Sequence, residues 1–132
     1  MSHSEQWIAL TKKAMSKAYV PYSHFQVGAV IETETGNIFS GCNVENASYP
    51  EGTCAEAGAI AAMVMGGDTL IKQIYVMGKG EQLVTPCGGC RQRIREFSSS
   101  ETLIHICSPE GIRKTLTMNE LLPYSFGPDN LK

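Results

Sequence analysis

The sequence predicts an α/β protein in which a mixed sheet of about five strands is flanked by helices. Two patterns predict this fold class. A strand–turn–strand pattern lies in the first third of the chain, and short β-branched apolar runs then alternate with helical patterns. The 132 residues suit one domain spanning residues 1–132, because two independent cores are hard to build from so short a chain.

The first half of the chain predicts a helix, a hairpin and a loop. Apolar residues recur every three or four positions over residues 4–19, which is typical of an amphipathic helix. Residues 26–32 and 37–44 are β-like, and the short turn between them contains Gly36, as in an antiparallel hairpin. Turn-forming residues over 45–52 predict a loop that leads into the next helix.

The second half alternates helix and strand. Thr53 and Glu56 have the spacing of a capping box, which predicts a helix start before the alanine-rich run 57–65. A second helix is expected to begin near Cys87 and to run to about Phe97. The remaining elements are expected to be strands over 71–77 and 103–107, a short strand over 115–117 and one helical turn over 119–122.

Charge and hydropathy exclude several classes of partner. The formal net charge is −2 and the chain has no long basic run, which disfavours binding to a nucleic acid polymer. The first five residues are polar and acidic rather than basic and then apolar, and no apolar run approaches about 18 residues. We therefore expect a cytoplasmic protein with no membrane partner.

The five cysteines divide into two groups. Cys42 and Cys107 lie in β-like apolar stretches, where free cysteine usually acts as a small buried hydrophobe. Cys87 and Cys90 have the C-x-x-C spacing with which two thiolates converge on one tetrahedral zinc ion, and Cys54 stands at the other predicted helix start. Three thiolates at two helix N-termini predict a zinc site with one open position, which is typical of catalysis.

Other interpretations of these residues remain open at this point. The C-x-x-C pair has the spacing of a redox dithiol, although it follows an earlier helix. His24 would close the site as a structural Cys3His centre. Glu56 can either complete a capping box with Thr53 or, two residues after Cys54, carry protons for a metal-activated water. A Cys-x-Glu followed by Pro-Cys-x-x-Cys is the sulfur-only form of the zinc deaminase signature, which favours the catalytic interpretation.

At Cys54-Ala55-Glu56 and across residues 86–92 the chain resembles the small, three-cysteine, homotetrameric class of cytidine deaminases. The resemblance implies a three-layer fold and one Zn²⁺ per subunit held by Cys54, Cys87 and Cys90. It also implies hydrolysis of free cytidine and 2′-deoxycytidine to uridine and 2′-deoxyuridine, with release of ammonia, as in pyrimidine salvage. Zinc-activated water would attack C4 of the cytosine while Glu56 shuttles protons.

The resemblance also assigns substrate contacts. Asn43 and Glu45 stand in a segment, residues 41–49, that resembles the family's nucleoside segment and implies hydrogen bonds to the ribose. Phe25 is expected at the pyrimidine, and the backbone of Ala55 is expected to help hold the base. Phe126 would cover the base bound in a neighbouring subunit, so that a homotetramer would share its active sites.

One position departs from the family pattern. Many members carry arginine directly after the catalytic glutamate, where this chain has Ala57. We hypothesise that Arg91 and the two helix dipoles offset the thiolate charge instead. Two further functions stay open, namely deamination of a modified cytosine nucleoside or of a base within RNA or DNA, and a non-catalytic zinc-stabilised binding module.

Overall fold

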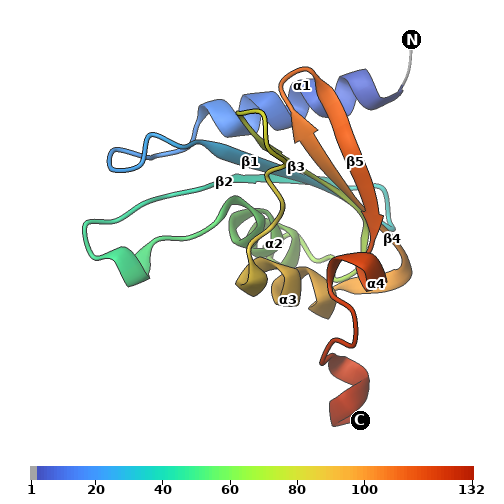
Figure 1. Cartoon of the computed structure of the whole chain (residues 1–132). Helices are drawn as coiled ribbons and strands as arrows, with labels where there is room; N and C mark the ends of the chain where they lie inside the picture. The colour runs from blue at the N-terminus through green and yellow to red at the C-terminus, as the bar shows by residue number, and fades with distance from the viewer. Residues whose placement is uncertain (1–2) are drawn as a thin grey trace.

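Five strands and four helices make up most of the protein, whose computed structural model describes residues 3–132 (Figure 1). Within those residues, each helix is too short or too polar to cross a membrane. The strands are β1 (Val27–Thr33), β2 (Ile38–Cys42), β3 (Ile71–Gly78), β4 (Ser98–Ser108) and β5 (Gly111–Thr117). The helices are α1 (His3–Ser16), α2 (Ala55–Met65), α3 (Gly88–Glu96) and α4 (Met118–Leu121), with short 3-10 turns at Tyr49–Glu51 and Pro128–Leu131.

The five strands form one mixed sheet in the order β2-β1-β3-β4-β5. Both β2 and β3 pair antiparallel with β1, so they run parallel to each other, and β4 is parallel to β3. Strands that run in the same direction need a crossover, and α2 and α3 supply the two crossovers. Because each helix follows the carboxyl end of its strand, α2 and α3 begin at the same edge of the sheet.

The helices form layers on both sides of the sheet, with α1 on one face and α2 and α3 on the other (Figure 1). Side chains alternate along each strand, so β3 sends Ile74 and Val76 toward α2 and α3, and sends Tyr75 and Met77 toward α1. The sheet and its covering helices confirm the predicted three-layer α/β fold.

Two glycines let helices touch the sheet backbone. A Cβ on Gly28 of β1 would lie 2.4 Å from the nitrogen of Met15 in α1. A Cβ on Gly41 of β2 would lie 2.4 Å from the nitrogen of Ala59 and 2.5 Å from the carbonyl oxygen of Ala55, both in α2. Only glycine leaves room for such close approach. Gly41 therefore sets the depth at which α2 packs.

A polar cluster lies under α1. The His105 ring stacks on Tyr75 at 4.3 Å between ring centroids. His105 Nε2 donates to Gln73 Oε1 at 2.9 Å, and its Nδ1 accepts from the Thr115 hydroxyl at 2.8 Å. Gln73 uses its amide nitrogen to donate to Glu32, which leaves its oxygen as the acceptor for the His105 Nε2 proton. Burial lowers the pKa of His105, which favours the neutral form of the ring.

Several element boundaries differ from those predicted. α1 ends at Ser16 instead of residue 19, because Tyr19 leaves the helix to form a β-bridge with Val44. β4 and β5 are longer than predicted, since pairing with each other extends both beyond their apolar cores. Cys107 is buried as expected, whereas the burial predicted for Cys42 is wrong because its side chain is only half-buried.

The close contact at Gly41 yields a first prediction. Gly41→Ala forces a methyl group into the backbone of α2 and is expected to lower the free energy of unfolding by about 1–3 kcal/mol. Gly58→Ala is the matched control, because a Cβ there meets atoms only at 3.7 Å or beyond, and alanine in a helix interior gains about 0.5–1 kcal/mol over glycine. Urea unfolding of both variants tests the contrast, and equal midpoints would contradict it.

Candidate metal centre and the adjoining cavity

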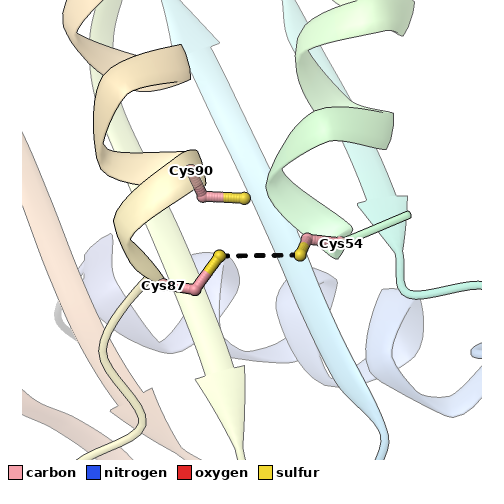
Figure 2. Close-up of side chains that lie close together, drawn as sticks. All are labelled: Cys54, Cys87 and Cys90. Atoms are coloured by element: carbon pink, nitrogen blue, oxygen red, sulfur yellow. Dashed lines mark hydrogen bonds between the residues drawn. The ribbon is translucent and has the colours of Figure 1, made fainter. Parts of the chain in front are cut away.

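Three cysteines meet where α2 and α3 begin. Cys54 is the N-cap residue of α2, Cys87 is the N-cap residue of α3, and Cys90 lies in the first turn of α3. Their sulfur atoms all lie within 4.8 Å of one another, and the Sγ atoms of Cys54 and Cys87 are 3.7 Å apart. Figure 2 shows the three side chains directed toward one another from the two helices.

This sulfur group fits zinc. Tetrahedral zinc with Zn–S bonds of about 2.3 Å places its sulfur ligands about 3.8 Å apart, close to the Cys54–Cys87 separation of 3.7 Å. Thiolates are the ligands zinc prefers, and the positive ends of two helix dipoles stabilise their charge. Among the described residues this is the one group of three or more potential ligands, and it contains no histidine. His24 therefore does not close the site.

The three thiols differ in their environments. Burial raises the pKa of Cys54 and of Cys90, whose side chain is 0 % exposed. A hydrogen bond from the backbone N–H of Cys90 lowers the pKa of Cys87, the most exposed of the three. Metal binding needs all three as thiolates, so Cys90 is the ligand whose charge most needs support from the protein.

A cavity of about 330 Å³ opens beside the sulfur atoms. Its volume is in the range of small-molecule sites. Both polar and apolar side chains line it, from the hairpin, the loop after β2, the start of α2 and the segment before α3. The lining residues are Phe25, Val27, Asn43, Val44, Glu45, Tyr49, Gly52, Thr53, Cys54, Ala55, Glu56, Val76, Val84, Thr85 and Cys87.

Glu56 lies at the wall of this cavity with only 4 % of its surface exposed. The predicted capping box with Thr53 is wrong. The backbone of Thr53 is instead paired with Val44 in a β-bridge, so Cys54 becomes the N-cap residue, and it makes no side-chain capping bond. Glu56 thus has no capping role, and burial raises the pKa of its carboxyl group.

Asn43 holds the backbone on both sides of residue 26. Its Oδ1 accepts from the Val27 N–H at 2.8 Å, and its Nδ2 donates to the Phe25 carbonyl oxygen at 2.9 Å. Both Asn43 and Phe25 line the cavity. Asn43 therefore fixes the segment that presents the Phe25 ring.

Glu45 fixes the turn at residues 22–24, which precedes Phe25. Its carboxylate accepts from the backbone N–H groups of Tyr22 at 3.0 Å and Ser23 at 3.1 Å, and from the Ser23 hydroxyl. The Ser23 hydroxyl bond lowers the pKa of Glu45, and the carboxylate is ionised at neutral pH. The turn includes His24 at a φ of 59°, in the left-handed region, and the hydrogen bonds that Tyr22 and Ser23 donate to Glu45 help to stabilise this conformation.

The proposed role of Arg91 in offsetting the thiolate charge is wrong. Its guanidinium donates to the carbonyl oxygens of Pro86 at 2.8 Å and Leu121 at 2.9 Å, and to the Thr85 hydroxyl at 3.1 Å. Position 91 follows Cys90 by one residue and so points about 100° around the helix from it. Arg93, three residues after Cys90, lies on the same face and donates to the Cys90 sulfur at 3.5 Å. The i, i+3 spacing was the signal in the sequence.

The two remaining predicted site residues differ in position. Ala55 is fully buried and lines the cavity at the start of α2. Phe126 is more than half exposed in the C-terminal segment, where Gln92 donates to its carbonyl oxygen at 2.8 Å. It is not among the residues that line this chain's own cavity, and its contact with a base in a neighbouring subunit stays a prediction.

Comparisons with known proteins agree with this site. The family model described as "Cytidine and deoxycytidylate deaminase zinc-binding region" matches residues 1–106. The chain is 40% identical over 127 residues to a cytidine deaminase of Sporosarcina psychrophila, covering 96% of this chain and 93% of the relative. It is 42% identical over 121 residues to one of Mycobacterium tuberculosis, covering 90% and 86%. A crystal structure of cytidine deaminase from Burkholderia pseudomallei superposes with a TM-score of 0.87 at 37% identity, covering 96% of this chain and 100% of that one.

The sulfur group predicts one bound zinc ion per chain. Cys54→Ser should weaken zinc affinity more than about 100-fold, because loss of a ligand exceeds the loss seen for residues that only support ligands. Cys42→Ser is the matched control, since Cys42 is half-buried and lies outside the group. Zinc content after dialysis against a competing chelator measures the difference, and similar loss from both variants would contradict the assignment.

Proposed function

The chain belongs to the cytidine deaminase family of zinc-dependent hydrolases, and on that premise we propose that it hydrolyses free cytidine and 2′-deoxycytidine. Water replaces the 4-amino group, so the products are uridine or 2′-deoxyuridine and ammonia. The observation that carries the proposal is the buried carboxyl group of Glu56 in a cavity shared with Cys54 and Cys87.

Glu56 is the proposed proton carrier. Cys54, Cys87 and Cys90 would hold zinc, which supplies the Lewis acidity that makes water a nucleophile at neutral pH. Glu56 would accept one proton of that water as C4 of the cytosine is attacked and deliver it to N3. It would then take the proton of the new C4 hydroxyl group and pass it to the amino group, which leaves as ammonia. Burial suits the carboxyl group to this exchange, because a raised pKa makes the carboxylate a stronger base toward water.

The cavity also offers groups for the rest of a nucleoside. Phe25 provides an aromatic face for the pyrimidine, and the backbone at Ala55 offers hydrogen-bonding groups to its polar edge. Asn43 and the ionised Glu45 offer an amide and an acceptor to the ribose hydroxyls. Both side chains are already held by backbone contacts, so little side-chain freedom would be lost on binding.

Two other functions are less well supported. A cytosine within RNA or DNA would bring several phosphates to a chain with a net charge of −2 and to a cavity that contains the carboxylate of Glu45. A non-catalytic zinc module would have no use for a buried Glu56 in an open cavity. A modified cytosine nucleoside would contact the same groups as cytidine. Direct assays of both compounds decide which of them is the substrate.

We further propose that four copies assemble and share their active sites, in the cytoplasm. The position of Phe126 supports this assembly. The residue is 57 % exposed, and Gln92 and Arg95 hold the segment around it through the Phe126 carbonyl oxygen and the Ser125 hydroxyl. A fixed, exposed aromatic side chain is suited to cover a base bound in a neighbouring copy.

Glu56→Gln tests the proton carrier. The substitution keeps the size of the side chain but removes its ability to exchange protons, so kcat for cytidine should fall by about 10²–10⁴-fold or more while zinc content stays the same. The fall in cytidine absorbance measures turnover. Glu34→Gln, at an exposed position in the β1–β2 turn, is the control and should keep full activity. A Glu56→Gln variant as active as the control would refute the assignment.

A substrate panel tests the choice of free nucleosides. Cytidine and 2′-deoxycytidine should be deaminated, whereas cytidine 5′-monophosphate should show kcat/KM lower by about tenfold or more, because repulsion from the Glu45 carboxylate of about 1.4 kcal/mol suffices for that factor. Glu45→Gln should bring kcat/KM for cytidine 5′-monophosphate closer to kcat/KM for cytidine, even though it weakens ribose binding. Equal kcat/KM for nucleoside and nucleotide in the unmodified protein would count against a nucleoside site.

A further inference from the structure

The proposed metal centre carries an unbalanced charge. Three thiolates on a divalent ion leave one net negative charge, and the Glu56 carboxyl group lies in the wall of the adjoining cavity. Water can solvate the exposed Cys87, but Cys90 is 0 % exposed. A buried anion without a partner is costly. The sulfur of Cys90 therefore needs a donor or a cation supplied by the protein.

Arg93 is placed to supply both. Its Nη1 donates to the Cys90 sulfur at 3.5 Å, within the range of a hydrogen bond to sulfur. Both residues belong to α3, three positions apart, and helical side chains lean back toward the N-terminus. The guanidinium thus reaches the first turn of its own helix, where the sulfur atoms meet.

The glycine beside Cys90 leaves the path of this side chain open. A Cβ on Gly89 would lie 3.2 Å from Arg93 Nη1, closer than ordinary packing allows. A Cβ on the neighbouring Gly88 would meet nothing within 4 Å. Of the two glycines between Cys87 and Cys90, Gly89 is thus the one whose missing side chain accommodates the guanidinium.

No other cation contacts the sulfur group within residues 3–132. The guanidinium of Arg91 is bonded to oxygen atoms of Thr85, Pro86 and Leu121. The residue that follows Glu56 on α2 is Ala57, which brings no charge from the other helix. Arg93 alone makes a hydrogen bond of this kind to Cys54, Cys87 or Cys90.

We propose that Arg93 is a positioning residue of the metal centre, which orients the Cys90 thiolate by an N–H···S hydrogen bond and offsets the negative charge of the three thiolates. The inference rests on the proposed function insofar as it assumes that the three cysteines hold zinc. By drawing electron density from the Cys90 sulfur, the guanidinium would also make a zinc ion held there a stronger Lewis acid.

Two consequences separate this role from general structural support. Loss of the hydrogen bond should speed the release of zinc, because residues that support metal ligands contribute about 10–100-fold to metal affinity. Arg93 does not line the cavity, so the same loss should lower kcat while leaving KM for cytidine nearly unchanged.

The experiment is the transfer of zinc from the zinc-loaded protein to a chromogenic chelator. Arg93→Ala should release zinc about 10–100-fold faster than the unmodified protein. Arg93→Lys, which keeps the charge but not the planar donor group, should lie between them. Arg95→Ala is the matched control on the same helix, because its guanidinium donates to the Ser125 hydroxyl and not to sulfur, and it should release zinc at the unmodified rate.

The readouts separate the possible failures. Arg93→Ala that releases zinc at the unmodified rate, or no faster than Arg95→Ala, overturns the role of Arg93 and leaves the proposed function intact. An unmodified protein that binds no zinc overturns the proposed function and this inference with it. Thermal unfolding of the metal-free proteins should be alike in all variants. Should Arg93→Ala fail to fold, the rates of zinc release from Arg93→Gln and Arg93→Lys are compared instead. Both keep a long polar side chain, but only lysine keeps the charge, so Arg93→Gln should release zinc faster, and equal rates would contradict the role of the charge.

Discussion

The parallel direction of β2 and β3 is the constraint on which the site depends. Because both strands run antiparallel to the strand between them, their carboxyl ends and the helices that follow meet at one edge of the sheet. Cysteines separated by 33 residues in sequence thereby approach to 3.7 Å. Gly41 is the second condition for this approach, because backbone contact between β2 and α2 sets how near Cys54 comes to α3. The metal centre is a product of sheet topology and of one close approach, and no single segment contains it.

Asn43 and Glu45 each combine an observed structural role with a proposed role in substrate binding. Asn43 and Glu45 are the expected ribose contacts, yet in the free chain they hold the backbone of the segment that carries Phe25. A sugar that bonds to these two side chains would therefore act on groups already fixed in place. Such preorganisation reduces the entropy lost on binding and couples recognition of the sugar to the placement of the aromatic ring.

Sequence reasoning predicted the fold class, the hairpin, both crossover helices and the grouping of the three cysteines, because each has a local signal in the chain. It failed where one pattern permits two outcomes. The Thr53 and Glu56 spacing suits a capping box, but the β-bridge between Thr53 and Val44 shifts the N-cap to Cys54. Arg91 and Arg93 are both cations near a ligand, and only helix geometry assigns the sulfur to Arg93. Tertiary pairing, which leaves no local signal, decided the first case, whereas the second was open to an argument from i, i+3 spacing.

The source of the compensating charge has a mechanical consequence. A cation on α2 would reach the Cys90 sulfur across the gap between the two helices, so that contact would depend on how closely α2 and α3 pack. Arg93 lies on the same helix as Cys87 and Cys90, three residues beyond the ligand it contacts. Ligand and cation then move together when α3 shifts, and the spacing between them is set by helix geometry alone. The centre can thus keep its charge balance at Cys90 through small changes in the packing of α2.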